Sequence, residues 1–149
     1  MNAAQLFGHW RTIRRGLFAA LDLLDDEQLT FTPREGLWSL GTVAVHIAEA
    51  EEGWFGYVVT RELEKWPDWS LQDYVTVAAV KALLAEVHDR TWAYLETQDE
   101  SDLDRIIDAP WDEQFPLRWV IWHVLEHETS HRGEIYLMLG LMGMEAPDV

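Results

Sequence analysis

The sequence has no cysteine, few basic residues and no long apolar run, and each absence excludes a class of protein. Without cysteine there is no disulfide, no thiolate metal ligand and no cysteine nucleophile, so any reactive thiol must arrive with a substrate. Apolar runs stay short of the ~18 residues that span a membrane. Arg11, Arg14 and Arg15 interrupt the stretch where a signal peptide would carry its apolar segment. The sequence therefore predicts a cytoplasmic protein with no membrane partner.

Positive charge is scarce as well. The chain has 11 Lys and Arg against 27 Asp and Glu, for a formal net charge of −16. Because nucleic-acid binding depends on basic side chains that neutralise phosphates, we expect no nucleic-acid partner. We interpret the acidic surface as one that keeps the protein soluble through mutual repulsion.

Apolar side chains are abundant. Hydrophobic residues make up 48% of the 149 residues and include nine tryptophans. This is enough for a packed interior, and the length suits one core. We therefore expect a single domain over residues 1–149.

Apolar residues recur at helical spacing in four segments, which predicts four helices. The segments cover residues 6–24, 43–57, 77–94 and 120–142. We expect helix caps at Asn2, Ser39, Ser70 with Asp73, and Gly143. Prolines interrupt the stretch 98–116, for which we expect short strands or a lid. Four amphipathic helices that must cover one another's apolar faces predict an all-α four-helix bundle.

Three of the six histidines stand four residues apart on the last predicted helix: His123, His127 and His131. Side chains four apart share one helix face, so either neighbouring pair can bind one metal ion. All three cannot, because His123 and His131 are separated by about 12 Å of helix rise. The third ligand must therefore come from another helix.

His46 is the strongest candidate for that ligand. It lies on the apolar stripe of the second helix, between Val43 and Ala50, where an unpaired polar ring would be costly. The alternative is a core histidine that hydrogen-bonds a neighbour. For His123 we expect helix packing or support of a ligand. His9 and His88 lie off the pattern, and we expect both to be solvated.

Residues 127–131 also spell H-E-x-x-H, the zincin signature, in which the glutamate is a general base. The context does not suit a zincin, because no downstream histidine and no strand-rich substrate sheet follow. Glu128 is then either a base for a metal-activated water or a solvent-facing side chain.

The last helix, HVLEHETSHRGEIYLMLGLMG from His123 to Gly143, resembles the C-terminal helix of the DinB/YfiT-like superfamily, whose members share H-x-x-x-H-x-x-x-H-R-G-[QE]. The segment from Leu37 to Trp54, which contains His46, resembles the family's second helix. Glu134 stands where many members have glutamine. The resemblance implies an up-down-down-up bundle, often a homodimer, with the metal ligands His46, His127 and His131 and water in the open positions.

The resemblance also implies a reaction class. Better understood relatives are metal-dependent transferases or isomerases that use low-molecular-weight thiols such as bacillithiol, mycothiol or glutathione. Our leading hypothesis is thus an enzyme with one divalent ion, zinc first and nickel second, that activates a small thiol against a small-molecule substrate. The alternatives are a metal-dependent hydrolase, a non-catalytic bundle that binds a small molecule or a structural metal ion with Glu49 as the candidate fourth ligand, and histidines that pair with buried carboxylates.

Overall fold

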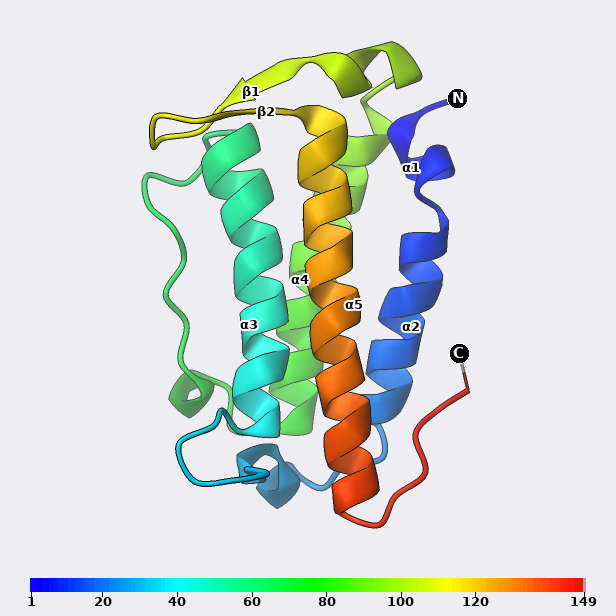
Figure 1. Ribbon diagram of the computed structural model, residues 1–149, viewed down its shortest axis with the longest axis vertical. Helices are drawn as coiled ribbons and strands as arrows, with labels where there is room; N and C mark the ends of the chain where they lie inside the picture. The colour runs from blue at the N-terminus through cyan, green and yellow to red at the C-terminus, as the bar shows by residue number, and fades with distance from the viewer. Residues whose placement is uncertain (149) are drawn as a thin grey trace.

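The structure, a computed structural model that describes residues 1–148, is a bundle of four long helices (Figure 1). These are α2 (His9–Leu21), α3 (Leu40–Glu52), α4 (Val77–Glu96) and α5 (Leu117–Leu141). The predicted all-α four-helix bundle is confirmed. Within the described residues, no helix is both long enough and apolar enough to cross a membrane.

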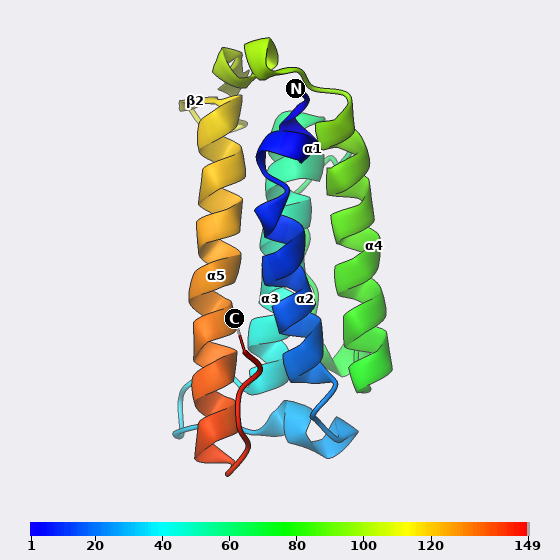
Figure 2. The same ribbon diagram turned by 90° about the vertical axis from the view of Figure 1, so that its right-hand side faces the viewer.

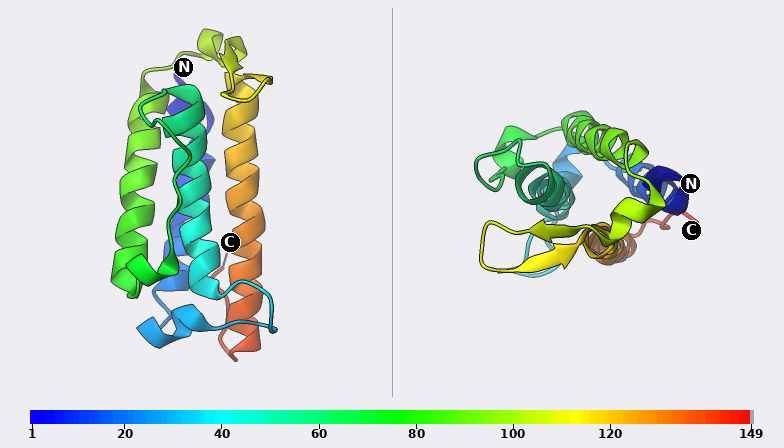
Figure 3. Two further views of the ribbon diagram at one scale, coloured as in Figure 1. Left: turned by 90° about the vertical axis from the view of Figure 1, so that its left-hand side faces the viewer. Right: turned by 90° about the horizontal axis from the view of Figure 1, so that it is seen from above.

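The helices follow the up-down-down-up order that the resemblance implies, with the two middle helices parallel. In Figure 1, α2 and α5 run downward while α3 and α4 run upward. Seen from above, α3 lies between α4 and α5, and α2 faces it across the bundle (Figure 3). Because α3 and α4 are parallel, residues 60–76 must return along the whole length of α3 before α4 begins. Figure 2 shows the opposite side, where α1 (Ala3–Leu6) precedes α2 near the upper end.

Three of the predicted caps are present. Asn2 and Gln5 form a reciprocal capping box at α1, and the Ser39 hydroxyl accepts a 3.2 Å hydrogen bond from the Thr42 amide at the start of α3. Gly143 follows α5 with φ of 82°, a left-handed conformation that glycine adopts without strain. The amide of Met144 then donates to the carbonyl of Leu139 at 2.9 Å, which closes the helix end.

The first predicted helix is wrong in one respect, because the chain forms α1 and α2 with a break at residues 7 and 8. The α1 segment is held elsewhere: the Ala3 amide donates to the Gln98 carbonyl at 2.7 Å. Phe7 is buried and packs edge-on against Trp122, with centroids 5.3 Å apart. These contacts with α5 and with the residues after α4 outweigh helical continuity.

The predicted capping box of Ser70 with Asp73 is also wrong. Ser70 caps only a short 3-10 helix, Leu71–Asp73, by accepting a hydrogen bond from the Gln72 amide. Thr76 caps α4 instead, accepting a 3.1 Å hydrogen bond from the Ala79 amide.

The upper end of α3 widens into a π-helix, Gly53–Val59, where Trp66 from the returning chain packs against it. A Cβ atom on Gly53 would lie 2.3 Å from the Trp66 ring, so only glycine permits this approach. The π-helix carries Trp54, which contacts the rings of Trp66, Trp111 and Trp119.

We expect Gly53→Ala to lower the free energy of unfolding by about 1–3 kcal/mol, because the added methyl group must displace Trp66. Gly133→Ala is the matched control. Gly133 lies in the middle of α5, and nothing stands within 4 Å of its added Cβ. Alanine there should raise stability by about 0.5–1 kcal/mol. Urea unfolding followed by circular dichroism measures both, and equal effects would contradict the close packing at Gly53.

The irregular stretch forms the expected short strands, β1 (Ile106–Asp108) and β2 (Gln114–Pro116). They pair antiparallel, with Ile107 opposite Phe115. The hairpin crosses the upper end of the bundle and leads directly into α5 (Figure 1).

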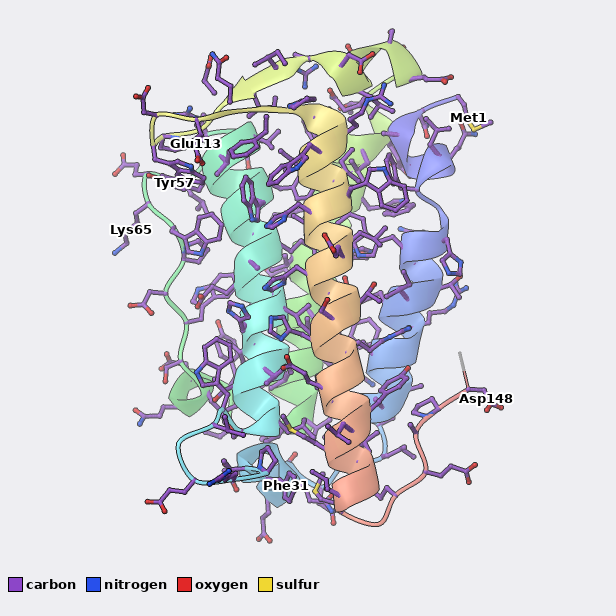
Figure 4. The ribbon with its side chains drawn as sticks, in the orientation of Figure 1. Met1, Phe31, Tyr57, Lys65, Glu113 and Asp148 are labelled. Carbon is purple, nitrogen blue, oxygen red and sulfur yellow. The ribbon has the colours of Figure 1, made fainter. Side chains whose placement is uncertain are left out.

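Side chains fill the space between the helices (Figure 4). The buried apolar residues form two clusters. The lower one contains Leu17, Leu84 and Leu139, and the upper one contains Trp10, Trp92 and Val120. A layer of buried polar side chains separates the two clusters.

Candidate metal centre

The structure brings together the three histidines that the sequence analysis proposed as ligands. His46 comes from α3, and His127 and His131 come from successive turns of α5. One potential ligand atom from each lies within 4.8 Å of the others. That they bind a metal stays a prediction, but the cross-helix grouping is present.

The ring geometry suits a shared ion. The Nε2 atoms of His46 and His127 are 2.9 Å apart. Two nitrogens bound to one ion at ~2.0–2.1 Å lie roughly 3 Å apart. The ring centroids of His46 and His131 are separated by 5.0 Å, and those of His127 and His131 by 4.4 Å.

The cluster favours the neutral form of two of its rings, His127 and His46. Burial and the neighbouring His131 and His46 lower the pKa of His127 to about 4. Burial and His131 also lower the pKa of His46. At neutral pH these rings therefore keep lone pairs free for a metal, which binds only deprotonated histidine.

A carboxylate supports one of the three rings, that of His131, from behind. His131 Nδ1 lies 3.0 Å from Glu134 Oε2, which leaves its Nε2 for the cluster. His46 Nδ1 lies 3.9 Å from Glu49 Oε1, beyond hydrogen-bonding distance. The other Glu49 oxygen accepts a 2.9 Å hydrogen bond from the Trp69 amide, so Glu49 is already engaged.

The surroundings of His127 favour a metal site over an ordinary histidine–carboxylate pair. Its Nδ1 is buried without a partner among the described residues, and its Nε2 faces only the His46 nitrogen. No carboxylate of residues 1–148 is hydrogen-bonded to this ring. Three imidazole nitrogens that converge in this way fit a divalent cation.

The other histidines lie apart from the cluster. His123 stacks on Trp119 at a 4.7 Å centroid distance and packs edge-on against Trp54 at 5.0 Å, which agrees with the expected packing role. His9 is exposed, as expected. The expectation of a solvated His88 is wrong, because only 6% of its surface is exposed.

Glu128 is neither a base facing the cluster nor a solvent-facing residue. It points into the bundle from a different face of α5 than the three clustered histidines occupy, and it is 1% exposed. Its Oε1 accepts a 2.7 Å hydrogen bond from Arg14 Nε, and its Oε2 accepts a 2.6 Å hydrogen bond from the Trp10 indole. The H-E-x-x-H spacing is therefore present without the zincin geometry.

Each of the four helices contributes one side chain to the buried polar layer: Arg14, Glu51, His88 and Glu128. Arg14 bonds both carboxylates, and its Nη1 donates to the Leu84 carbonyl at 2.8 Å. His88 Nδ1 lies 2.8 Å from Glu51. Burial alone would raise the pKa of Glu51, but the charge of Arg14 and the His88 hydrogen bond lower it to about 2. Because Glu128 directly follows His127, these bonds hold α5 in place beside the histidine cluster.

Trp38 is a site residue that sequence reasoning missed. It lies in the loop before α3, where no periodicity marks it. Its ring packs edge-on against His46 at 4.8 Å and lies nearly parallel to His131 at 6.4 Å. Half of its surface is exposed, so it covers the cluster on one side only.

The fold and the cluster define a class: a four-helix bundle with three histidines in the groove between two antiparallel helices. A match to the DinB superfamily covers residues 9–135. The chain belongs to this superfamily.

Solved structures support the same fold. A DinB-like protein from Bacillus cereus is 22% identical, with a TM-score of 0.81 over 99% of this chain and 97% of that one. The DinB-like YjoA of Bacillus subtilis is 20% identical, with a TM-score of 0.75 over 97% and 96% of the two chains. YfiT of Bacillus subtilis, described as "a probable metal-dependent hydrolase with an unusual four-helix bundle topology", is 21% identical, with a TM-score of 0.72 over 96% and 89%. Comparison with curated proteins finds no match.

Proposed function

We propose that this protein is a metal-dependent enzyme in which His46, His127 and His131 hold one divalent ion that activates a low-molecular-weight thiol for transfer to an electrophilic small molecule. The observation that carries the proposal is the convergence of three imidazoles from two helices. When bound there, such an ion would supply positive charge that lowers the pKa of a thiol or a water beside it. Zinc is our first choice of metal and nickel our second.

The surroundings favour catalysis over a purely structural ion. Structural sites are normally closed by a fourth protein ligand. Here Glu49 is bonded to the Trp69 amide, and Glu128 is bonded to Arg14 and Trp10 inside the bundle. The side chain of His46 is 29% exposed and that of His131 is 18% exposed, so a small molecule has access to the cluster.

The position of Glu128 also favours a thiol over water as the nucleophile. Hydrolysis in the zincin manner needs a carboxylate base beside the ligands. Glu128, the residue at that place in the motif, is engaged by Arg14 and Trp10. A thiol ionises more readily than water and needs no such base. Because YfiT is described as a probable metal-dependent hydrolase, the reaction with water is the second candidate.

A spectroscopic titration distinguishes the candidates. The protein is loaded with cobalt(II), a coloured substitute for zinc, and titrated with bacillithiol, mycothiol and glutathione. We expect one thiol to produce a saturable sulfur-to-cobalt absorption band in the wild type. The band should be absent in His127→Ala and retained in His9→Ala, which changes an exposed histidine outside the cluster.

A different result would redirect the assignment. Absence of the band with all three thiols, together with metal-dependent hydrolysis of para-nitrophenyl acetate, would replace the thiol reaction with hydrolysis. Absence of both, with the metal retained, would identify a non-catalytic metal-binding bundle.

A further inference from the structure

An apolar cleft of about 480 Å³ opens beside the histidine cluster, between the second half of α5 and the loop before α3. This volume lies within the ~300–1,000 Å³ range of small-molecule sites. Most of its wall is carbon, supplied by Leu37, Trp38, Val43, Leu137, Met138 and Leu141.

Several of these side chains are unusually exposed for their type. Leu37 is 57% exposed, Leu137 is 65% exposed and Leu141 is 58% exposed. Contiguous apolar surface around a hollow is typical of ligand-binding grooves. The arrangement therefore indicates an apolar occupant.

The cleft is continuous with the histidine cluster. His131 and its partner Glu134 line the cleft directly. Trp38 lines it as well and also contacts the His46 ring. A group held at the histidines would thus have its nearest apolar surface in this cleft.

The hollow on the other side of Trp38 has the opposite character. It measures about 540 Å³, and Glu49, Asp68 and Ser70 supply much of its lining. The two hollows flank the same tryptophan, so the site distinguishes an apolar side from a polar side.

We propose that the cleft lined by Leu37, Leu137 and Leu141 binds an alkyl or acyl chain of the substrate, whose reactive end meets the histidine cluster. This inference rests on the proposed function, since it takes the cluster to hold a metal. It adds the substrate class: a molecule with a linear apolar chain next to its reactive group.

Straight-chain hydroxamates test the inference without knowledge of the reaction. Their two oxygens chelate a divalent ion, and only the alkyl chain varies from acetohydroxamate through butyro- and hexano- to octanohydroxamate. With zinc-loaded protein in a calorimeter, we expect affinity to rise about 4-fold per added methylene, the equivalent of about 0.8 kcal/mol. The rise should end when the chain fills the cleft.

The double variant Leu137→Gln with Leu141→Gln should reduce the rise to less than about 2-fold per methylene while acetohydroxamate binds as before. Both leucines are exposed, so the variant should fold. Leu23→Gln is the matched control, because Leu23 is 47% exposed and lies at the end of α2 outside the cleft. Zinc content is measured in every sample.

Each contrary outcome has its own meaning. Tight acetohydroxamate binding without a chain-length effect in the wild type would overturn the cleft and leave the metal site intact. An effect that survives the double variant would place the chain elsewhere and also overturn the inference. Sedimentation that shows a wild-type dimer broken by the double variant, with no chain-length effect, would assign the cleft to a second copy. Absence of zinc and of all hydroxamate binding would overturn the proposed function and this inference with it.

Discussion

Replacing His127 by alanine is expected to abolish the tight binding of one divalent ion per chain, whereas replacing His123 by alanine should leave it intact. The two residues stand one turn apart on α5, and either could pair with its neighbour by spacing alone. Only His127 faces His46, at 2.9 Å between their Nε2 atoms. His123 instead packs between Trp119 and Trp54.

The effect should be large because His127 is the central member of the cluster. Residues that merely orient a metal ligand typically contribute 10–100-fold to affinity. Loss of a ligand should therefore lower affinity by more than about 100-fold. His46→Ala and His131→Ala should behave like His127→Ala, and Glu134→Gln should have a smaller effect because it only supports His131.

Metal content by mass spectrometry after dialysis, followed by competition with a chromophoric chelator, measures these differences. Circular dichroism must show that each variant remains helical. Equal loss of metal in His123→Ala and His127→Ala would contradict the assigned ligand set. An ion that is retained in both His46→Ala and His127→Ala would contradict a site between α3 and α5.

The bundle, and a histidine site shared between two helices, could be predicted from sequence because both depend on helical periodicity. The choice of His127 with His131 over His123 with His127 came from the family resemblance. A polar ring on an apolar stripe identified His46, and the rise per residue separated His123 from His131. Periodicity could not reveal the break at Gly8, which depends on contacts of Phe7 with another helix. Nor could it reveal Trp38, which lies in a loop and reaches the cluster only after the chain has folded.

The buried polar layer shows the same limit. Arg14 lies between Trp10 and Leu17 on an apolar face, a signal that could have identified it as unusual. Its partner Glu128 is 114 residues away, and no local pattern predicts that pairing. For the same reason, His88 was expected to be solvated, although its ring pairs with Glu51 inside the bundle.

Arg14→Met should lower the free energy of unfolding by about 3–5 kcal/mol, because removing one partner leaves buried carboxylates uncompensated. Arg14 bonds Glu51 and Glu128, both of which are 1% exposed or less. Arg15→Met is the matched control. Arg15 is exposed, and its side chain bonds Thr12 within the same helix, so its loss should change stability by no more than about 0.5 kcal/mol. Urea unfolding of the metal-free proteins measures both.

A compound variant shows whether stranded charge is the cause. If it is, combining Arg14→Met with Glu51→Gln and Glu128→Gln should recover at least half of the lost stability, because neutral amides need no buried cation. A compound variant as unstable as Arg14→Met would instead attribute the loss to packing and to the hydrogen bonds from Trp10 and His88.

Since Glu128 directly follows His127, Arg14→Met should also weaken metal binding by about 10-fold, as expected for a residue that positions a ligand-bearing helix. Unchanged metal affinity in a destabilised Arg14→Met protein would show that the polar layer stabilises the bundle but does not position the metal ligands.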